Sequence, residues 1–454
     1  MPQYVPTPRR CREFSRAGNG FIHIYLRGDS MVQISRAVRR AAVFATAASL
    51  VTLTACSSDS GSDSTSENLD GRGPITYVEG KDTTETGVVR QIIDAWNAEH
   101  PDEQVTFKEQ SNDADQAHDD LVQHLQAKQS DYDVVALDVP WTAEFAAKGW
   151  LQPLTGEFAV DNTGILPATV DSATYNGTQY AAPKNTNGGL LYYRSDLLPA
   201  APKTWAELAA ACEVAKTNNI DCYAGQFAPY EGLTVNTAEV INAYGGSFVG
   251  EDGKTPTVDS PEARAGLQVL VDNFKNGDIP AQDTTFKEPE SQKAFEDGKA
   301  LFLRNWPYVY GTADKDSSAV KGKFAVAPLP GKDGIGASTL GGYNAAISAY
   351  SENKATARDF LTFLQGEQAQ RIIALGSLPP VRAALYDDPE IIAAYPFMPT
   401  LKVSIENAVP RPVTPYYPAV SKAVQDNAYA AIKGEKSVDQ AITDMQSGIQ
   451  SAGS

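Results

Sequence analysis

The pattern of apolar and polar positions after residue 73 predicts strands and helices in alternation. The segments "PITYVEG", "QVTFKEQ" and "YDVVALD" have the composition of strands, and the last is apolar enough to be buried. The segment "TGVVRQIIDAWNAEHP", the stretch around Leu121 to Leu125 and "EFAAKGW" have helical spacing. This order predicts a parallel sheet with crossover helices.

The same alternation restarts after "QYAAPKNTNGGLLYYRSDLLP". A helix is expected in "KTWAELAAACEVAK", where Thr204 and Glu207 have the spacing of a capping box. Another is expected in "SPEARAGLQVLVDNFKNG", with Ser260 as N-cap and Gly277 at its end. Strand signals in "KALFLRN" and "KFAVAPLP" precede one helix over "ATARDFLTFLQGEQAQRIIALG" and a final helix from Ser437. The chain is therefore predicted to be an α/β protein with two α/β units.

A different pattern precedes these units. Arg36, Arg39 and Arg40 stand before an apolar run that ends at Cys56. The run is shorter than the roughly 20 residues that a permanent transmembrane helix needs. Residues 1–56 are therefore predicted to be a leader and signal peptide, removed from the mature protein.

The end of the apolar run, "LTAC", resembles the bacterial lipobox, in which the cysteine receives a lipid after cleavage. Cys56 is therefore predicted to anchor the protein to the outer face of the cell membrane; an ordinary secretory signal is the alternative. Met31 fits the start of such a signal better than Met1. Residues 57–73, rich in Ser, Asp and Gly, are predicted to be a flexible linker.

The whole chain carries 38 basic and 56 acidic side chains. The predicted leader holds 8 arginines and 2 acidic residues, so 30 basic and 54 acidic side chains remain, a formal charge of −24. Such a surface repels nucleic acid, which argues against a nucleic-acid partner. The length after the linker is enough for two lobes with their own cores.

Cys212 and Cys222 lie close together in the second unit, and such a pair in an exported protein can oxidise to a disulfide; two buried thiols are the alternative. His118 and His124 lie nearly opposite each other on one predicted helix, so they are expected on the solvated surface. Sequence motifs for zinc, a nucleophilic serine and nucleotides are absent. The sequence therefore predicts no metal, no cofactor and no catalytic residue.

Carboxylates, amides and aromatic residues follow several strand signals, as in "VEGKDTTE", "LDVPWTAE", "RNWPYVY", "LGGYN" and "PRPVTPYY". In open α/β sheets, ligands bind beyond the carboxyl ends of the strands. Carboxylates and amides can hydrogen-bond several hydroxyls, while Trp and Tyr rings can cover the CH faces of a pyranose. This combination favours a neutral sugar as the ligand.

Four segments carry a resemblance to a known family: "DVVALDVPWTAEFAAKGWLQPL", "QYAAPKNTNGGLLYYRSDLL", "FLRNWPYVY" and "RPVTPYY". From about Pro74 onward, the chain resembles the carbohydrate-binding extracellular solute-binding proteins (family 1) of ABC importers, which include trehalose- and maltose-binding proteins. The resemblance implies a two-lobed, type II periplasmic-binding-protein-like α/β fold with the ligand in a cleft between lobes joined by hinge crossings. Its expected segments are 74–183 and 348–388 for lobe 1, and 184–347 and 389–454 for lobe 2.

The resemblance also implies which residues bind the sugar. The matching positions are Glu85, Asn112, Asp138, Asn187, Glu231, Trp306, Tyr308, Gly341, Gly342 and Arg411. Trp306 and Tyr308 match a stacking pair, and Gly341 and Gly342 match a turn that offers backbone N–H groups. Asn187 stands where similar binders often have Asp, which leaves the charge of that contact open.

Each of these residues also has a structural alternative. Trp306 can be a core residue, Glu85 and Asp138 can be helix caps, and Arg411 can form an ordinary ion pair. The two glycines can serve the turn alone.

By this resemblance the protein is a lipid-anchored, monomeric receptor that hands an α-linked disaccharide such as trehalose or maltose to a membrane permease. One alternative is an anchored glycoside hydrolase, with carboxylates from Glu85, Asp138 and Glu231. The eight regular strand–helix units of a barrel enzyme are not visible, which weakens it. A receptor for a peptide or polyamine is a third possibility, although a peptide receptor does not need this set of rings and hydroxyl acceptors.

Overall fold

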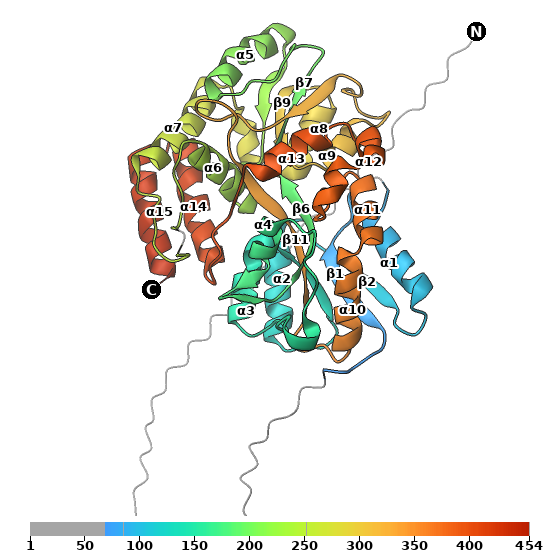
Figure 1. The fold of residues 1–454 in the computed structure, drawn as a ribbon. Coiled ribbons are helices and arrows are strands. Elements are labelled where there is room, and N and C mark those ends of the chain that lie inside the picture. The colour runs from blue at the N-terminus through green and yellow to red at the C-terminus, as the bar shows by residue number, and fades with distance from the viewer. Residues whose placement is uncertain (1–68, 85, 251, 454) are drawn as a thin grey trace, which may run out of the picture. The chain divides into compact units, whose positions relative to one another are not determined.

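The computed structural model describes residues 69–84, 86–250 and 252–453, which build two larger β-sheets with helices on their faces and one two-stranded sheet (Figure 1). All of them belong to the unit that runs from Ser66 to Ser454. The predicted signal peptide with Cys56, the linker up to residue 68 and the site candidate Glu85 lie outside the described residues. Among the helices in the described ranges, none combines the length and the apolar character needed to cross a membrane.

The first sheet has six strands in the order β12-β11-β3-β1-β2, with β6 also paired to β11. They are β1 (Ile75–Gly80), β2 (Val105–Gln110), β3 (Val134–Asp138), β6 (Ala182–Gly188), β11 (Ser338–Ile347) and β12 (Ala408–Pro410). β1 pairs in parallel with β2 and β3, whereas β11 runs antiparallel to β3 and β6. The predicted parallel sheet is therefore confirmed for its first three strands.

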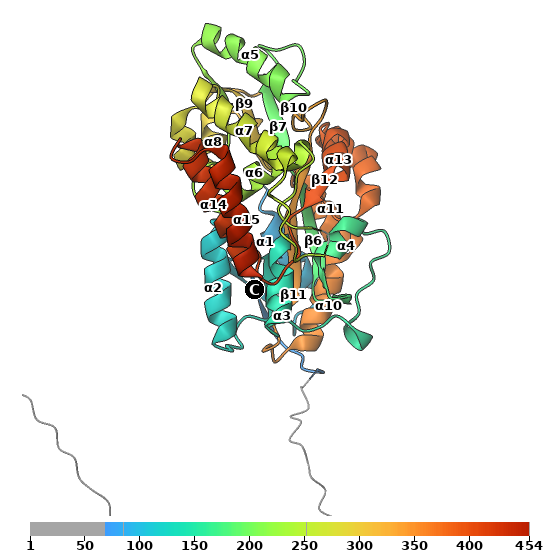
Figure 2. The same ribbon diagram turned by 90° about the vertical axis from the view of Figure 1, so that its left-hand side faces the viewer.

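Helices cover both faces of the first sheet because its buried side chains alternate between them. Tyr77 packs in the core formed with α1 (Val88–Glu99), α10 (Lys354–Gln365) and α11 (Glu367–Leu375). Its neighbour Val78 packs on the other face, with α2 (Ala114–Gln126) and α3 (Thr142–Ala147). Figure 2 shows α2 and α10 on opposite sides of these strands. We call this sheet and its helices the first lobe.

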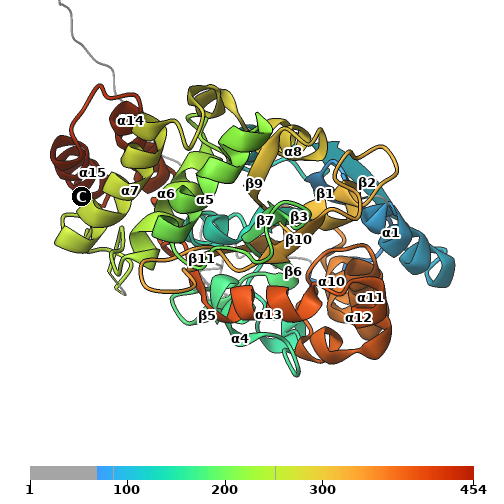
Figure 3. The same cartoon turned by 90° about the horizontal axis from the view of Figure 1, so that it is seen from above.

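The second sheet has four strands in the order β10-β7-β9-β8. They are β7 (Leu190–Arg194), β8 (Asp221–Ala224), β9 (Ala300–Asn305) and β10 (Phe324–Ala327). One core contains α5 (Trp205–Asn218), α6 (Glu231–Ala243), α7 (Pro261–Asn276), α14 (Tyr417–Ile432) and α15 (Val438–Ala452), grouped in Figure 3. The other contains α8 (Glu288–Glu296), α9 (Val309–Ala313), α12 (Pro389–Ala394) and α13 (Met398–Glu406). We call this sheet and its helices the second lobe.

Short elements complete the described part of the chain. They are α4 (Pro167–Ser172), the hairpin strands β4 (Thr174–Tyr175) and β5 (Thr178–Gln179), and the 3-10 turns η1 (Val139–Trp141), η2 (Gly156–Phe158), η3 (Ala281–Thr285) and η4 (Ala383–Asp387).

The chain passes between the two sheets through very short links. β6 of the first sheet is followed by β7 of the second after the single residue Gly189. The Gly189 N–H donates to Ser338 Oγ in β11 (2.5 Å), and the Gly189 carbonyl accepts from Ser404 Oγ in α13 (2.7 Å). These bonds hold the link where the lobes meet. β6 and β11 pair with each other and belong to the first sheet. The lobe boundaries expected at residues 183/184, 347/348 and 388/389 stay predictions.

Local end signals in the sequence are confirmed where a side chain caps a helix. Thr204 and Glu207 form the predicted capping box of α5. Ser260 caps α7, which ends at Gly277 with a φ of 78°. The prediction of one helix after residue 354 was wrong, because Gly366 adopts an extended conformation with ψ of 159° and separates α10 from α11.

The expectation that the two histidines of α2 are solvated was also wrong. The His118 side chain is only 13% exposed, and its Nε2 lies 2.7 Å from the Glu144 carboxylate of α3. The His124 ring stacks on Tyr132 with ring centroids 3.4 Å apart. The helix therefore buries more than its apolar stripe, because His118 pairs with Glu144 and His124 stacks on Tyr132.

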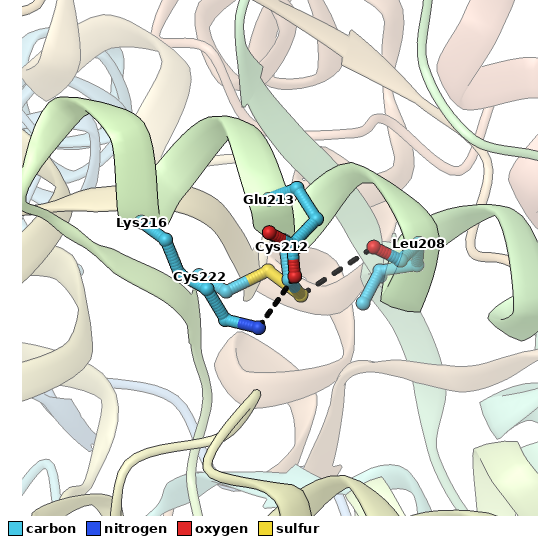
Figure 4. The surroundings of a disulfide bond; sticks show 5 residues. All are labelled: Leu208, Cys212, Glu213, Lys216 and Cys222. Atoms are coloured by element: carbon cyan, nitrogen blue, oxygen red, sulfur yellow. Dashed lines mark hydrogen bonds and ion pairs between the residues drawn. A yellow bond between two sulfur atoms is a disulfide. The ribbon is translucent and has the colours of Figure 1, made fainter.

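The second lobe contains the predicted disulfide. Cys212, in α5, and Cys222, in β8, are bonded, with their Cα atoms 5.1 Å apart (Figure 4). The left-handed residue Asn219 ends α5 and turns the chain into β8, which brings the two cysteines together. Because the pair joins neighbouring elements of one core, it restrains the second lobe alone.

Asp283 is a buried carboxyl group in this lobe, 1% exposed, that accepts one hydrogen bond from the Gly225 N–H at 3.1 Å. Burial raises its pKa from 3.8 to about 8. An unfolded chain releases this proton near its ordinary pKa, whereas the folded protein keeps it until about pH 8. Ionisation of Asp283 therefore lowers the free energy of unfolding progressively as the pH rises between these two values.

We expect Asp283→Asn to be more stable than the unsubstituted protein at pH 8, and the difference to shrink toward pH 4. Asparagine keeps the acceptor for Gly225 without a charge to bury. Urea unfolding at several pH values measures this, with the exposed Asp102→Asn as control. An Asp283→Asn effect of equal size at pH 4 and pH 8 would contradict the assignment.

Candidate ligand-binding site

Arg411 joins carboxylates from both lobes. Its guanidinium pairs with both carboxylate oxygens of Asp138, at 2.9 and 2.5 Å, and donates to Glu231 Oε1 at 2.7 Å. Asp138 ends β3 of the first lobe, while Glu231 begins α6 of the second. Arg411, Asp138 and Glu231 are 5, 9 and 6% exposed, respectively. We call these three residues the interlobe triad.

Further donors on α14 stabilise the charges of the interlobe triad. The Tyr417 hydroxyl donates to Glu231 Oε1, and Ser421 Oγ donates to Glu231 Oε2 at 2.5 Å. Burial raises the pKa of Glu231, and Arg411 opposes that rise. Burial disfavours the charged form of Arg411, but Asp138 above all holds the pKa of Arg411 well above its ordinary value. Arg411 Nε is buried with no hydrogen-bond partner in the described part of the chain.

Trp306 supplies an aromatic surface at the end of β9. Its ring lies over the guanidinium of Arg304, with 4.1 Å from Cζ to the ring centroid. A Cβ added to Gly341 would lie 3.0 Å from Trp306 Cζ3 and 3.2 Å from Asn187 Cβ. Any larger residue at this position would make a tight contact with the indole, so glycine favours the close approach of β11. Asn187 pairs with Gly341 across β6 and β11, and Asn187 Oδ1 is buried without a partner among the described residues.

More polar groups meet where β1 and β3 end. Tyr343 lies opposite Asp138 in β11. Burial raises the pKa of the Tyr343 hydroxyl, and the carboxylates of Asp138 and Glu79 raise it further. Glu79, near the end of β1, accepts from the Tyr77 hydroxyl at 2.6 Å and pairs with Lys184 of β6. The carboxyl ends of the parallel strands thus carry the oxygen-rich groups that their position predicts for a ligand site.

A second contact between the lobes joins the N-termini of α2 and α6. Asp113, the N-cap of α2, pairs with Lys287 of the second lobe. Asp115 Oδ1 accepts from the backbone N–H of Glu231 at 3.3 Å. A residue of the first lobe therefore satisfies a backbone donor at the start of α6, beside the interlobe triad.

The structure brings together two groups of the residues expected from the sequence. Asp138, Glu231 and Arg411 form the interlobe triad. Trp306, Asn187 and Gly341 form the second group: Asn187 pairs with Gly341 across β6 and β11, and the Trp306 ring lies beside Gly341.

The remaining expected residues lie around these groups. Tyr308 precedes α9 and packs against the second-lobe core, and Asn112 is exposed beside the start of α2. The prediction that Gly341 and Gly342 form a turn was wrong, since both lie inside β11, Gly342 with a φ of 111°. The close approach of β6 and of Trp306, rather than chain reversal, explains the glycines.

Several contacting residues were not expected from the sequence. Glu79, Lys184, Arg304, Asp113 and Lys287 belong to this set. Arg304 carried a visible signal, because it is a charge inside the apolar strand segment "ALFLRN". The others gave no signal, since their partners are more than 100 positions away in the sequence. In the described ranges, no cluster of three or more His, Cys, Asp or Glu side chains is arranged to hold a metal ion.

Residues 80–371 match the model of a family described as bacterial extracellular solute-binding protein. A probable ABC transporter-binding protein of Deinococcus radiodurans is 35% identical over 341 residues, covering 71% of this chain and 80% of that protein. A mannitol-binding protein of Pseudomonas aeruginosa is 28% identical over 354 residues, covering 69% and 79%.

Solved structures show the same architecture. Maltose-bound MalE3 of T. maritima is 35% identical, covers 83% of this chain and 99% of its own, and has a TM-score of 0.78. The GacH receptor of Streptomyces glaucescens GLA.O, 24% identical with a TM-score of 0.76, covers 84% of this chain and 98% of its own, and supports the fold alone. The predicted two-lobed, type II periplasmic-binding-protein-like fold is confirmed.

We expect Arg411→Met to lower the free energy of unfolding by about 3–5 kcal/mol, because it leaves two buried carboxylates without their cation. Urea unfolding at neutral pH measures the loss. Arg264→Met is the matched control, since its partners Asp259 and Asp439 lie at the surface and such pairs contribute about 0–1 kcal/mol. Equal losses in the two variants would show that the interlobe triad does not join the lobes.

Proposed function

The chain belongs to the bacterial extracellular solute-binding proteins, and we propose that it is the sugar receptor of an ABC importer. It captures an α-linked disaccharide such as trehalose or maltose between its lobes and delivers it to a membrane permease. The single observation that carries the proposal is the aromatic surface of Trp306 beside β11, the strand that pairs with β3, which ends in Asp138, and with β12, which precedes Arg411. The maltose bound to the MalE3 relative and the similarity to a probable ABC transporter-binding protein of D. radiodurans support it.

In this proposal the polar groups bind hydroxyls and the ring covers the sugar's CH face. Carboxylates accept hydroxyl hydrogen bonds, the guanidinium donates them, and charge-assisted bonds are stronger than neutral ones. The ligand residues are Glu85, Asn112, Asp138, Asn187, Glu231, Trp306, Tyr308, Gly341, Gly342 and Arg411. Because Arg411 already contacts both carboxylates, a sugar hydroxyl must share or displace one of these bonds. Binding and lobe movement are therefore linked.

Hydrolysis finds less support than binding. The carboxylates of Asp138 and Glu231 share one guanidinium, so each is already engaged in a hydrogen-bonded ion pair. The family is described as solute-binding, and both relatives carry the names of binding proteins. We therefore propose a monomeric receptor that makes and breaks no covalent bond and needs no cofactor.

We further propose that Cys56 carries the lipid that holds the receptor at the outer face of the membrane. The support is "LTAC" at the end of the apolar run and the extracellular family to which the chain belongs. Cys56→Ser should move the protein from the membrane fraction to the soluble fraction on immunoblots. Unchanged membrane retention would contradict the anchor.

We expect calorimetric titration with trehalose or maltose to give a micromolar dissociation constant, about 8 kcal/mol, and no sugar cleavage products by chromatography. Trp306→Ala should weaken binding by roughly 10- to 100-fold, because it removes the stacking surface. The matched control is Tyr244→Ala, which should leave the affinity unchanged. Tyr244 is a partly buried aromatic residue that packs against the core of the second lobe.

Other ligands give other results in the same titration. If mannitol gives heat and no α-glucoside does, the ligand is a linear polyol and not a disaccharide, as for the mannitol-binding protein of P. aeruginosa. Turnover of an α-glucoside would contradict the receptor proposal.

A further inference from the structure

Arg304 is a charged residue in the middle of the second sheet. It lies in β9, where Leu303 precedes it and Asn305 follows it, and its side chain is 1% exposed. Its Nε and Nη2 donate to the two carboxylate oxygens of Glu239 in α6, at 2.8 and 2.5 Å. Its Nη1 donates to Gln226 Oε1 at 3.1 Å. These three hydrogen bonds fix the orientation of the guanidinium.

The Cζ atom of this guanidinium lies over the indole of Trp306, 4.1 Å from the ring centroid. The backbone of Trp306 is fixed separately, because its N–H donates to Asn305 Oδ1 and its carbonyl accepts from the Tyr192 hydroxyl, both at 2.8 Å. These bonds fix the position of the Trp306 backbone, but they do not fix the rotation of its side chain. Arg304 covers one face of the ring, and the edge of the ring contacts Gly341.

The other end of the ion pair contacts the links between the lobes. Glu239 Oε1 accepts from the backbone N–H of Thr339 in β11 at 3.2 Å. A Cβ added to Gly189, the residue between β6 and β7, would lie 2.7 Å from Glu239 Oε1 and 2.9 Å from Arg304 Nη2. The pair therefore packs against two segments that connect the lobes.

Packing alone does not account for a charged pair at this place. Removing an ion pair from water costs free energy that its mutual attraction offsets only partly, and apolar side chains of similar volume often stabilise a core as well or better. What Arg304 supplies beyond packing is a planar, cationic surface, which attracts an aromatic face and orients it.

We propose that the Arg304–Glu239 pair is a positioning element, which fixes the Trp306 ring against the links between the lobes and so sets sugar affinity without touching the sugar. The proposal rests on the proposed function, because it assumes that the sugar stacks on Trp306. The cation holds the ring from one side, and the sugar covers the opposite side.

A double-mutant cycle tests this. The variant is Arg304→Met with Glu239→Gln, which removes both charges together and leaves no unpaired buried charge. Gln keeps an acceptor for the Thr339 N–H. Dissociation constants for maltose and trehalose are measured with this variant in the unsubstituted protein and in Trp306→Ala.

We expect the variant to weaken binding about 10-fold in the unsubstituted protein, and less than about 2-fold in the Trp306→Ala protein. We also expect sugar binding to change tryptophan fluorescence through Trp306. The Trp306→Ala substitution should remove this signal, and the Arg304→Met/Glu239→Gln variant should alter it. The matched control, Arg371→Met with Asp388→Asn, removes a partly exposed ion pair and should leave affinity unchanged in both proteins.

Equal losses in both proteins, or no loss in either, would overturn the proposal. If the variant does not fold in a thermal melt, Arg304→Lys keeps a cation beside Glu239 without the planar surface, and the same cycle is measured with it. If the unsubstituted protein binds neither maltose nor trehalose, the proposed function fails. If it binds them but the variants do not behave as expected, only the positioning role of the Arg304–Glu239 pair fails.

Discussion

The structure depends on one arginine that is shared by carboxylates from two lobes. Arg411 contacts Asp138 at the end of a first-lobe strand and Glu231 at the start of a second-lobe helix. Two buried carboxylates repel each other, and the guanidinium between them offsets that repulsion where the lobes meet. The same oxygen-rich groups are the ones that a hydroxylated ligand needs. In the proposed receptor, the contact between the lobes and ligand binding therefore depend on one set of hydrogen bonds.

The remainder of the site follows from how β6 and β11 are built. They pair with each other in the first sheet, and β6 is separated from the second sheet by Gly189 alone. Gly341 lets the Trp306 ring approach β11, and the Arg304–Glu239 pair supports that ring from the second lobe. An aromatic surface from one lobe is thus placed beside polar groups from the other.

The sequence predicted the features that depend on neighbouring residues. The capping box of α5, the ends of α7 and the disulfide were visible because each partner is near in the chain. Asp138 and Arg411 lie in segments that the sequence marked as polar, a family resemblance gave them their roles, and their direct pairing, 273 positions apart, was not predicted. Gly341 was given the wrong role because a close approach between strands and a turn both favour glycine.

The account is tested most directly by a crystal structure of the protein bound to trehalose or maltose. It predicts a pyranose ring stacked on the face of Trp306 opposite Arg304, with sugar hydroxyls bonded to Asp138 and Arg411. A sugar bound elsewhere, with the interlobe triad unchanged and the Trp306 ring not in contact with it, would contradict the account.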